Sequence, residues 1–283
     1  MSNNDTQISQ VSMFLIPVSR FNIIELNLYV LSLLSGIGFA IGFIGGTVGL
    51  VLGVLRFPFI LSSEASIAAT AGTNIGVSTM GAAIASIQHF RQNNVNTRIF
   101  LIMGLTGAIG AFIGSLFTRY MPISILLIGI SVIVLYEAYL LIRSSKIIKT
   151  EQNQTHTSMN RTIWKESLIG FAIGFLGGLV GLVLGSIRLP TMISVFKMNI
   201  KTAVGTNLAA SALMGVFGLL GHIINYEVDF VVLSVMGVAA MIGGFAGARY
   251  SQRFSDKSIK KILGIVLIAV GVTMFIRAII LGF

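Results

Sequence analysis

Residues 38–58 read GFAIGFIGGTVGLVLGVLRFP, and residues 170–190 read GFAIGFLGGLVGLVLGSIRLP. The two stretches match at 16 of 21 positions, with an offset of 132 residues. A match of this length between two parts of one chain indicates an internal duplication. Each copy is apolar, carries a pair of neighbouring glycines, and ends with an arginine two residues before a proline.

The match between the copies continues beyond these stretches. The motif Ala71-Gly72-Thr73-Asn74 corresponds to Val204-Gly205-Thr206-Asn207 at an offset of 133 residues, and Ser78 corresponds to Ser211. A polar stretch separates the copies. We therefore divide the chain into an N-terminal polar segment (1–25), a first repeat (26–143), a polar linker (144–162) and a second repeat (163–283).

The composition indicates the class of protein. Of the 283 residues, 55% are hydrophobic and only 10% are charged, and the mean hydropathy is +0.93. A soluble domain carries about 25% charged residues, so most of this chain cannot face water. A transmembrane helix needs about 20 apolar residues, and backbone polar groups inside a bilayer must be paired within the segment. We predict an all-α, multi-pass protein of the plasma membrane with eight hydrophobic helical segments, four per repeat: 26–61, 66–90, 97–117, 122–143, 163–193, 200–222, 229–250 and 258–281.

The charged residues give a formal net charge of +10. The basic side chains lie between apolar runs and form no continuous face, which argues against nucleic acid as a partner and favours a role in membrane topology. The sequence contains no cysteine, so disulfides, thiolate metal ligands and a cysteine nucleophile are excluded.

The first segment of each repeat contains a glycine pair, Gly45-Gly46 or Gly177-Gly178. Because glycine costs about 1 kcal/mol in a helix interior, we expect the helix to break at each pair. If the chain still crossed the membrane there, the repeats would be parallel, and the 19 Lys and Arg would divide ten to nine between the two sides. If each broken segment turned back as a re-entrant hairpin, the repeats would be inverted, with fifteen of the 19 on one side. The positive-inside rule favours inverted repeats with a cytoplasmic linker, and a broken but continuous first helix stays open.

Other glycines recur at three- and four-residue spacing on one segment of each repeat. They are Gly104, Gly107, Gly110 and Gly114 in the first repeat, and Gly237, Gly243, Gly244 and Gly247 in the second. Small residues at this spacing let helix backbones approach closely in membranes, so we expect helix packing at these positions.

The broken segments suggest a binding site for an anion. A helix that begins near the middle of the bilayer has unpaired backbone N–H groups and a positive dipole end. We expect the two glycine turns and the two Gly-Thr-Asn motifs to meet near the midplane, where neutral donors replace the water around an anion. The candidate residues are Gly45, Gly46, Thr47, Thr73 and Asn74 in the first repeat and Gly177, Gly178, Thr206 and Asn207 in the second. In the alternative interpretation, the two asparagines only link helices or cap the turns.

Arg56 and Arg188 occupy matched positions in the two repeats. In the inverted arrangement one arginine lies toward each mouth of the pathway, where a cation raises the local concentration of anions. In the alternative, each arginine extends toward the lipid headgroups.

Three other ionisable residues, His89, His222 and Glu137, are candidates for a function. His89 and His222 match across the repeats, but inverted repeats place them on opposite faces, so we expect no metal site. Glu137 lies well inside a predicted span and is a candidate for proton coupling. It is about 7 Å from the end of its helix, however, and this depth favours an interfacial position.

The glycine-rich turns before Pro58 and Pro190, the paired Gly-Thr-Asn motifs and the two four-segment halves resemble the TauE/SafE family of sulfite and organosulfonate exporters. The likeness covers about residues 28–281. It implies a plasma-membrane permease for small sulfur oxyanions or related organic acids, with about eight transmembrane segments. Asn74 and Asn207 stand where many members carry Ser, which leaves the exact substrate open.

We therefore predict a transporter of a small anion, sulfite or an organosulfonate, that exports its substrate by alternating access. The alternatives are uptake of another small organic acid or sulfur oxyanion, and proton-coupled transport of a cation. No acid pair, catalytic triad, metal cluster or nucleotide-binding motif can be assembled from the sequence, so we expect neither an enzyme nor a cofactor. The expected partners are the anion and the lipid bilayer, and a homodimer stays open.

Overall fold

The computed structural model describes residues 28–48, 50–62, 66–147 and 163–250, and isolated residues between 265 and 280. The N-terminal segment 1–25, most of the linker 144–162 and most of the eighth predicted segment, 258–281, lie outside the described residues.

All regular elements in the described part of the chain are helices. The first repeat forms α2 (Leu28–Val48), α3 (Gly53–Leu61), α4 (Ile67–Arg91), α5 (Thr97–Phe117), the short 3-10 helix η2 (Thr118–Tyr120) and α6 (Ile123–Ile147). The second repeat forms α7 (Ile163–Val180), α8 (Gly185–Ser194), α9 (Ile200–Ile224) and α10 (Phe230–Tyr250). The all-α prediction is confirmed.

The helix breaks lie where the glycine pairs predict them. Helix α2 ends at Val48 and α7 ends at Val180, each two residues after its pair. A new, shorter helix begins a few residues later, at Gly53 or at Gly185. Each predicted first segment is therefore two helices joined by a turn.

Short polar turns set the ends of the long helices. The side chains of Asn96 and Asn199 accept hydrogen bonds from the backbone N–H groups of Ile99 and Thr202, at 3.1 and 2.8 Å, and so cap the N-termini of α5 and α9. These caps end the connection between α4 and α5 (92–96) and that between α8 and α9 (195–199).

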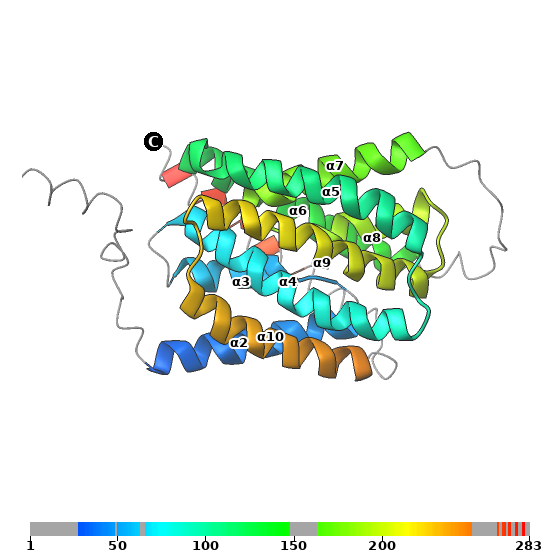
Figure 1. Cartoon of the computed structure of the whole chain (residues 1–283). Coiled ribbons are helices and arrows are strands. Elements are labelled where there is room, and N and C mark those ends of the chain that lie inside the picture. The colour runs from blue at the N-terminus through cyan, green and yellow to red at the C-terminus, as the bar shows by residue number, and fades with distance from the viewer. Residues whose placement is uncertain are drawn as a thin grey trace, which may run out of the picture.

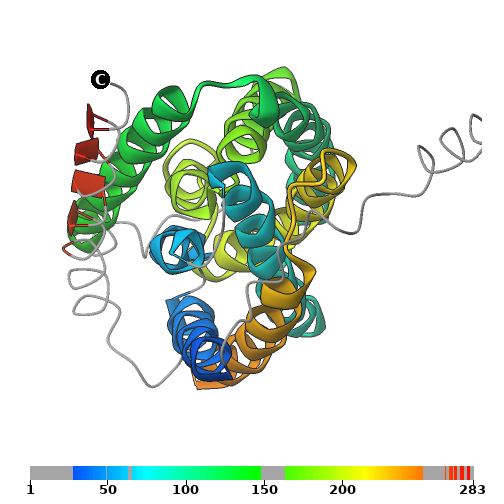
Figure 2. The ribbon, with the colours of Figure 1, turned by 90° about the vertical axis from the view of Figure 1, so that its left-hand side faces the viewer.

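Helices α4 and α9 pack against each other in opposite directions. Along α4, Gly72 lies against His222 of α9, and Thr79 lies against Gly215. The residue numbers rise on one helix while they fall on the other, so the two helices are antiparallel. Figure 1 shows this pair in the middle of the molecule, and the end-on view in Figure 2 agrees.

The outer helices pack in parallel pairs, each with one helix from each repeat. Gly38, Gly42 and Gly46 of α2 lie against Met236, Ala240 and Gly244 of α10, in the same order along both chains. Helices α5 and α7 are paired in the same way. In Figure 2, the α2–α10 pair and the α5–α7 pair lie on opposite sides of α4 and α9.

The predicted packing glycines lie within these pairs. A Cβ atom on Gly110 or Gly114 of α5 would meet the carbonyl oxygen of Phe171 or Phe175 of α7. On α10, Gly243 and Gly247 lie in the same way against the backbone of α2. The prediction of close helix packing at these glycines is confirmed.

The directions of the helices show that the chain doubles back between α2 and α4. Helix α10 returns after a five-residue connection and runs opposite to α9, so it runs parallel to α4. Because α2 is parallel to α10, α2 and α4 also run in the same direction. The turn after α2 and the nine-residue α3 bring the chain back. The same reasoning applies to α7, α8 and α9.

Five of the described helical stretches are long and apolar enough to cross a membrane: 29–47, 97–120, 163–180, 201–224 and 230–249. A shorter apolar stretch, 124–140, lies in α6. Helix α4 is not among the five, although it has 25 residues. Its polar residues, which include Thr70, Thr73, Asn74 and Ser78, are buried against neighbouring helices, so lipid does not have to solvate them.

Candidate functional site

The two glycine turns have the same local geometry. The backbone N–H of Leu50 donates to the carbonyl oxygen of Gly45 at 3.0 Å, and that of Leu182 donates to Gly177 at 2.8 Å. Gly45 and Gly177 therefore lie directly against the returning chain, where a side chain would collide with a backbone oxygen.

Gly46 and Gly178 face the neighbouring helices. A Cβ atom on Gly46 would collide with the carbonyl oxygen of Gly244 on α10, and one on Gly178 would collide with that of Ala111 on α5. Thr47 follows Gly46, and its hydroxyl donates to the carbonyl oxygen of Ile44 at 2.7 Å. These contacts give the three residues structural roles in addition to any contact with a substrate.

One glycine of the second turn joins the two repeats. Gly181 has a φ angle of +69°, and a Cβ atom there would collide with Ala71 of α4. The Asn74 side chain on α4 donates through Nδ2 to the carbonyl oxygen of Gly181 at 2.9 Å. The Asn motif of the first repeat therefore contacts the glycine turn of the second repeat, as the sequence predicts.

Each asparagine also lies at the start of the short helix of its own repeat. A Cβ atom on Gly53, the first residue of α3, would be 3.1 Å from Nδ2 of Asn74. A Cβ atom on Gly185, the first residue of α8, would be 3.1 Å from Nδ2 of Asn207. Neither short helix has a side-chain cap, and both asparagines are fully buried. The positive end of each short helix therefore lies beside a buried amide.

The hydroxyl groups of the two motif threonines, Thr73 and Thr206, are already engaged in hydrogen bonds. Thr206 Oγ1 accepts a hydrogen bond from the backbone N–H of Asn96 at 2.9 Å, and Thr73 Oγ1 accepts one from Asp229 at 2.9 Å. Each threonine thus holds a helix connection of the other repeat. The sequence motif does not reveal this use, because the partners are more than 100 residues away.

Arg188 is the largest fully buried side chain, and its guanidinium is surrounded by α9. Nε donates to Oδ1 of Asn207 at 2.9 Å, and Nη2 donates to the carbonyl oxygen of Asn207 at 3.1 Å. Nη2 also donates to Ser211 Oγ, and Nη1 lies 2.7 Å from the sulfur of Met214. Every guanidinium nitrogen therefore has a partner.

Arg56 occupies the matched position and is also buried, but it has fewer partners. Nη2 donates to Ser78 Oγ at 2.7 Å. Among the residues that the structure describes, Nε of Arg56 and Oδ1 of Asn74 have no hydrogen-bond partner. No described carboxylate lies within salt-bridge distance of either arginine.

The expected position of the arginines at two hydrated mouths disagrees with this burial. Arg56 is 3% exposed and Arg188 is 0% exposed. Extension toward lipid headgroups is excluded for the same reason. The serines that receive the guanidinium groups, Ser78 and Ser211, are 22 and 23 residues further along the chain, so local sequence gives no signal of the contact.

A small, partly open pocket lies beside Arg56. Its polar side chains are Arg56 and Ser78, and its other lining residues are apolar or glycine: Ile41, Gly42, Gly45, Gly46, Leu50, Val51, Leu52, Gly81, Ala85, Leu208 and Gly244. Residues of the first glycine turn, α4, α9 and α10 therefore contribute to the lining of this pocket.

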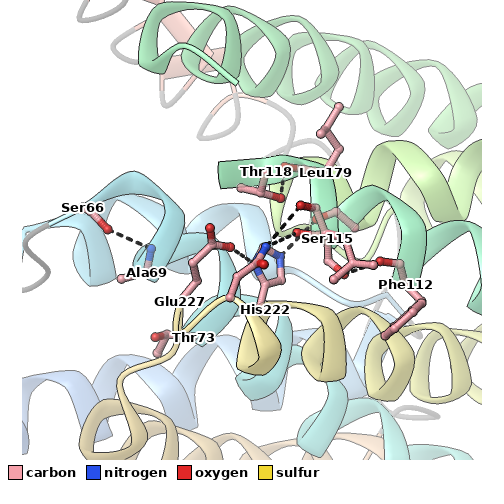
Figure 3. A network of polar contacts seen from close by, with 12 residues as sticks. Ser66, Ala69, Thr73, Phe112, Ser115, Thr118, Leu179, His222 and Glu227 are labelled. Atoms are coloured by element: carbon pink, nitrogen blue, oxygen red, sulfur yellow. Dashed lines mark hydrogen bonds and ion pairs between the residues drawn. The ribbon is translucent and has the colours of Figure 1, made fainter. Parts of the chain in front are cut away.

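A buried histidine contributes a polar network that the sequence did not predict. His222 Nδ1 lies 2.8 Å from Oε2 of Glu227, and Nε2 lies 3.1 Å from the carbonyl oxygen of Gly178 (Figure 3). The network connects the end of α9 to the second glycine turn. His222 is thus paired with Glu227. In the described parts of the chain, no three His, Cys, Asp or Glu side chains lie close enough together to hold a metal ion.

Glu137 lies in the interior and not at the interface expected from its depth. Its exposure is 3%, and Oε1 has no hydrogen-bond partner among the described residues. The residue lies on α6, which packs against α8, and it does not line the pocket beside Arg56.

Comparison with known proteins gives a consistent result. The family model described as "Sulfite exporter TauE/SafE" matches residues 34–274. The "Probable membrane transporter protein YdhB" of Bacillus subtilis is 30% identical over 224 residues, which cover 76% of this chain and 86% of the relative. The "Probable membrane transporter protein YunE" of the same organism is 26% identical over 256 residues, covering 83% and 93%. A "Probable membrane transporter protein" of Xylella fastidiosa is 23% identical, covering 86% and 92%. No solved structure matches the chain.

Proposed function

The chain belongs to the sulfite exporter TauE/SafE family of membrane transporters, and we propose that it exports a small anion, sulfite or a sulfonate. The proposal that the substrate is an anion rests on Arg56, which is buried and lies beside a pocket. Its guanidinium has one hydrogen-bond partner, Ser78, and no described carboxylate within salt-bridge distance. A buried cation is costly unless a negative charge compensates it, and a bound anion supplies that charge.

The start of α3 offers neutral donors that suit an oxyanion. It is uncapped and lies next to the pocket residues Leu52 and Ser78, while the Asn74 amide already donates to Gly181. Backbone N–H groups at a helix N-terminus and a guanidinium both bind oxygen atoms of small anions. Sulfite and sulfonates present three such oxygens on one compact group.

The proposed mechanism is alternating access by two inverted repeats with re-entrant hairpins. Two observations support it: α4 and α9 are matched elements that run antiparallel, and the chain doubles back after α2 and after α7. Repeats of opposite orientation supply two similar halves that can exchange conformations, which is the usual basis of alternating access.

Export is supported by the position of the pocket along α4. Its lining residues on this helix, Ser78, Gly81 and Ala85, lie toward the end that carries Arg91. The positive-inside rule assigns this end to the cytoplasm, so an anion would enter from there. With the cell interior negative, each negative charge that leaves gains about 2.3 kcal/mol per 100 mV, and export then needs no coupled ion.

The proposal is tested with purified protein in liposomes loaded with radiolabelled sulfite. Excess external anion should accelerate the exchange of label when it is a substrate, so sulfite, methanesulfonate, sulfate, acetate and chloride are compared at equal concentration. Acceleration by sulfite or methanesulfonate supports the proposed substrate class. No exchange of labelled sulfite with any external anion would refute sulfite transport. Uptake of labelled acetate by the same liposomes would then favour the organic-acid alternative.

A further inference from the structure

The two repeats place the same polar residue types, Asn and Ser, beside their buried arginines. Arg56, Asn74 and Ser78 in the first repeat correspond to Arg188, Asn207 and Ser211 in the second. The next residue on the same face of the helix differs, because Gly81 of α4 corresponds to Met214 of α9.

Met214 fills the space beside Arg188. Its sulfur lies 2.7 Å from Nη1, while Asn207 and Ser211 receive the other guanidinium nitrogens. Each guanidinium nitrogen of the arginine in the second repeat therefore already has a protein partner.

Gly81 leaves the corresponding space beside Arg56 open. Gly81 and Arg56 both line the small pocket described above, together with Ser78. On this side, Nε of Arg56 and Oδ1 of Asn74 lack the hydrogen bond that the matched pair Arg188 and Asn207 makes at 2.9 Å. The first repeat thus has an unused donor on a buried cation and a cavity next to it.

We infer that the two half-sites are not equivalent: Arg56 and Ser78 bind the transported anion, Gly81 sets how large the anion can be, and Arg188 is a structural residue. This inference rests on the proposed function and adds which half-site is used. In the second repeat, the Met214 side chain occupies the space beside the arginine that the substrate occupies in the first repeat.

The space around Gly81 is large enough for a test in which this glycine is replaced by methionine, the residue at the matched position 214. A Cβ atom on Gly81 would be 3.7 Å from the carbonyl oxygen of Ala240 and 4.0 Å from its Cβ, which are ordinary van der Waals distances. The Cβ atom of a methionine therefore fits at this position without a collision. Because Ala240 stands where Gly107 makes room for Met214, the introduced side chain has to take a different rotamer from that of Met214 to fill the pocket.

The experiment measures equilibrium binding of radiolabelled sulfite and methanesulfonate to the purified, detergent-solubilised full chain. Gly81→Met should lower the affinity for both anions by about tenfold or more, and for methanesulfonate more than for sulfite. Gly81→Ala, which adds one methyl group, should lower either affinity by less than about threefold. Arg56→Gln should lower both by about ten- to 150-fold, the loss expected for a hydrogen bond to a charged group. Met214→Ala should bind both anions like the wild type.

Arg188→Gln needs a second readout, because the loss of four contacts can unfold the protein. We expect it to lower the melting temperature more than Arg56→Gln does, since Arg56 has one such contact. Wild-type affinity in Gly81→Met, or increased binding in Met214→Ala, would overturn the inference and favour two arginines that exchange roles. A wild-type protein that binds neither anion would instead refute the proposed function itself.

Discussion

The Asn74 side chain on α4 donates a 2.9 Å hydrogen bond to the carbonyl oxygen of Gly181, in the turn between α7 and α8 of the other repeat. Residues 107 positions apart thus join the Gly-Thr-Asn motif of one half to the glycine turn of the other. This contact places the start of α3, the second turn and the pocket beside Arg56 in one region of the protein.

Asn74→Ala should weaken both the fold and anion binding. It removes one buried interhelical hydrogen bond, which in membrane proteins contributes about 0.5–2 kcal/mol. Thermal unfolding of the purified variant in detergent measures the first effect, and sulfite binding measures the second. Ser86→Ala is the control, because Ser86 on the same helix donates only to the carbonyl oxygen of Ala83. Equal melting temperatures for Asn74→Ala and the wild type would contradict the role of this contact.

Gly181→Ala should destabilise the second turn strongly. The residue has a φ angle of +69°, and an added Cβ atom would collide with Ala71. The backbone strain alone is of order 1–3 kcal/mol, before the collision is counted. Gly36→Ala on α2 is the matched control, because nothing lies within 4 Å of its added Cβ. We expect a large loss of melting temperature in the first variant and none in the second, and similar behaviour of the two would be inconsistent with the turn described here.

Glu137→Gln should keep anion flux within about twofold of the wild type, because Glu137 lies on α6 outside the pocket lining. Flux of sulfite into liposomes is measured at several pH values for both proteins. A variant that remains folded but loses a pH-dependent part of the flux would show that this buried carboxyl group couples transport to protons.

The orientation of the repeats can be tested at two matched positions in the helix connections. Asn93 and Tyr226 follow the ends of α4 and α9 with φ angles of +56° and +59°, and both side chains are exposed. Since the native chain has no cysteine, Asn93→Cys and Tyr226→Cys each introduce a single thiol. In inverted repeats, a membrane-impermeant thiol reagent labels Tyr226→Cys in intact cells and Asn93→Cys only after permeabilisation. Labelling of both from the same side would require parallel repeats.

The fold features that could be predicted from sequence are those encoded locally or by repetition. The glycine pairs break α2 and α7, and glycines such as Gly110 and Gly243 pack against another backbone, because both effects depend on the absence of a side chain. The duplication further indicated that matched residues would have related environments, and Arg56 and Arg188 are indeed both buried against a serine.

The features that were missed depend on partners in distant parts of the sequence. The burial of the arginines was not predicted, because a single arginine near the end of an apolar run is equally compatible with a surface and with an interior that provides Ser78 or Ser211. The use of Thr73 and Thr206 to hold Asp229 and Asn96 could not be seen before the repeats were placed against each other. The difference between Gly81 and Met214 is visible in the sequence, but its meaning depends on the contact between Met214 and Arg188.

The most direct test of the central claim is the electrical current that sulfite produces across a membrane containing the purified protein. If the protein carries the anion without a coupled ion, an inward-directed sulfite gradient across the vesicle membrane should produce a saturable movement of negative charge into the vesicle. The current should be absent in vesicles without protein and strongly reduced in Arg56→Gln, while Met214→Ala retains it. A wild-type protein that gives no current and no flux with sulfite or methanesulfonate, or a full current in Arg56→Gln, would contradict the account.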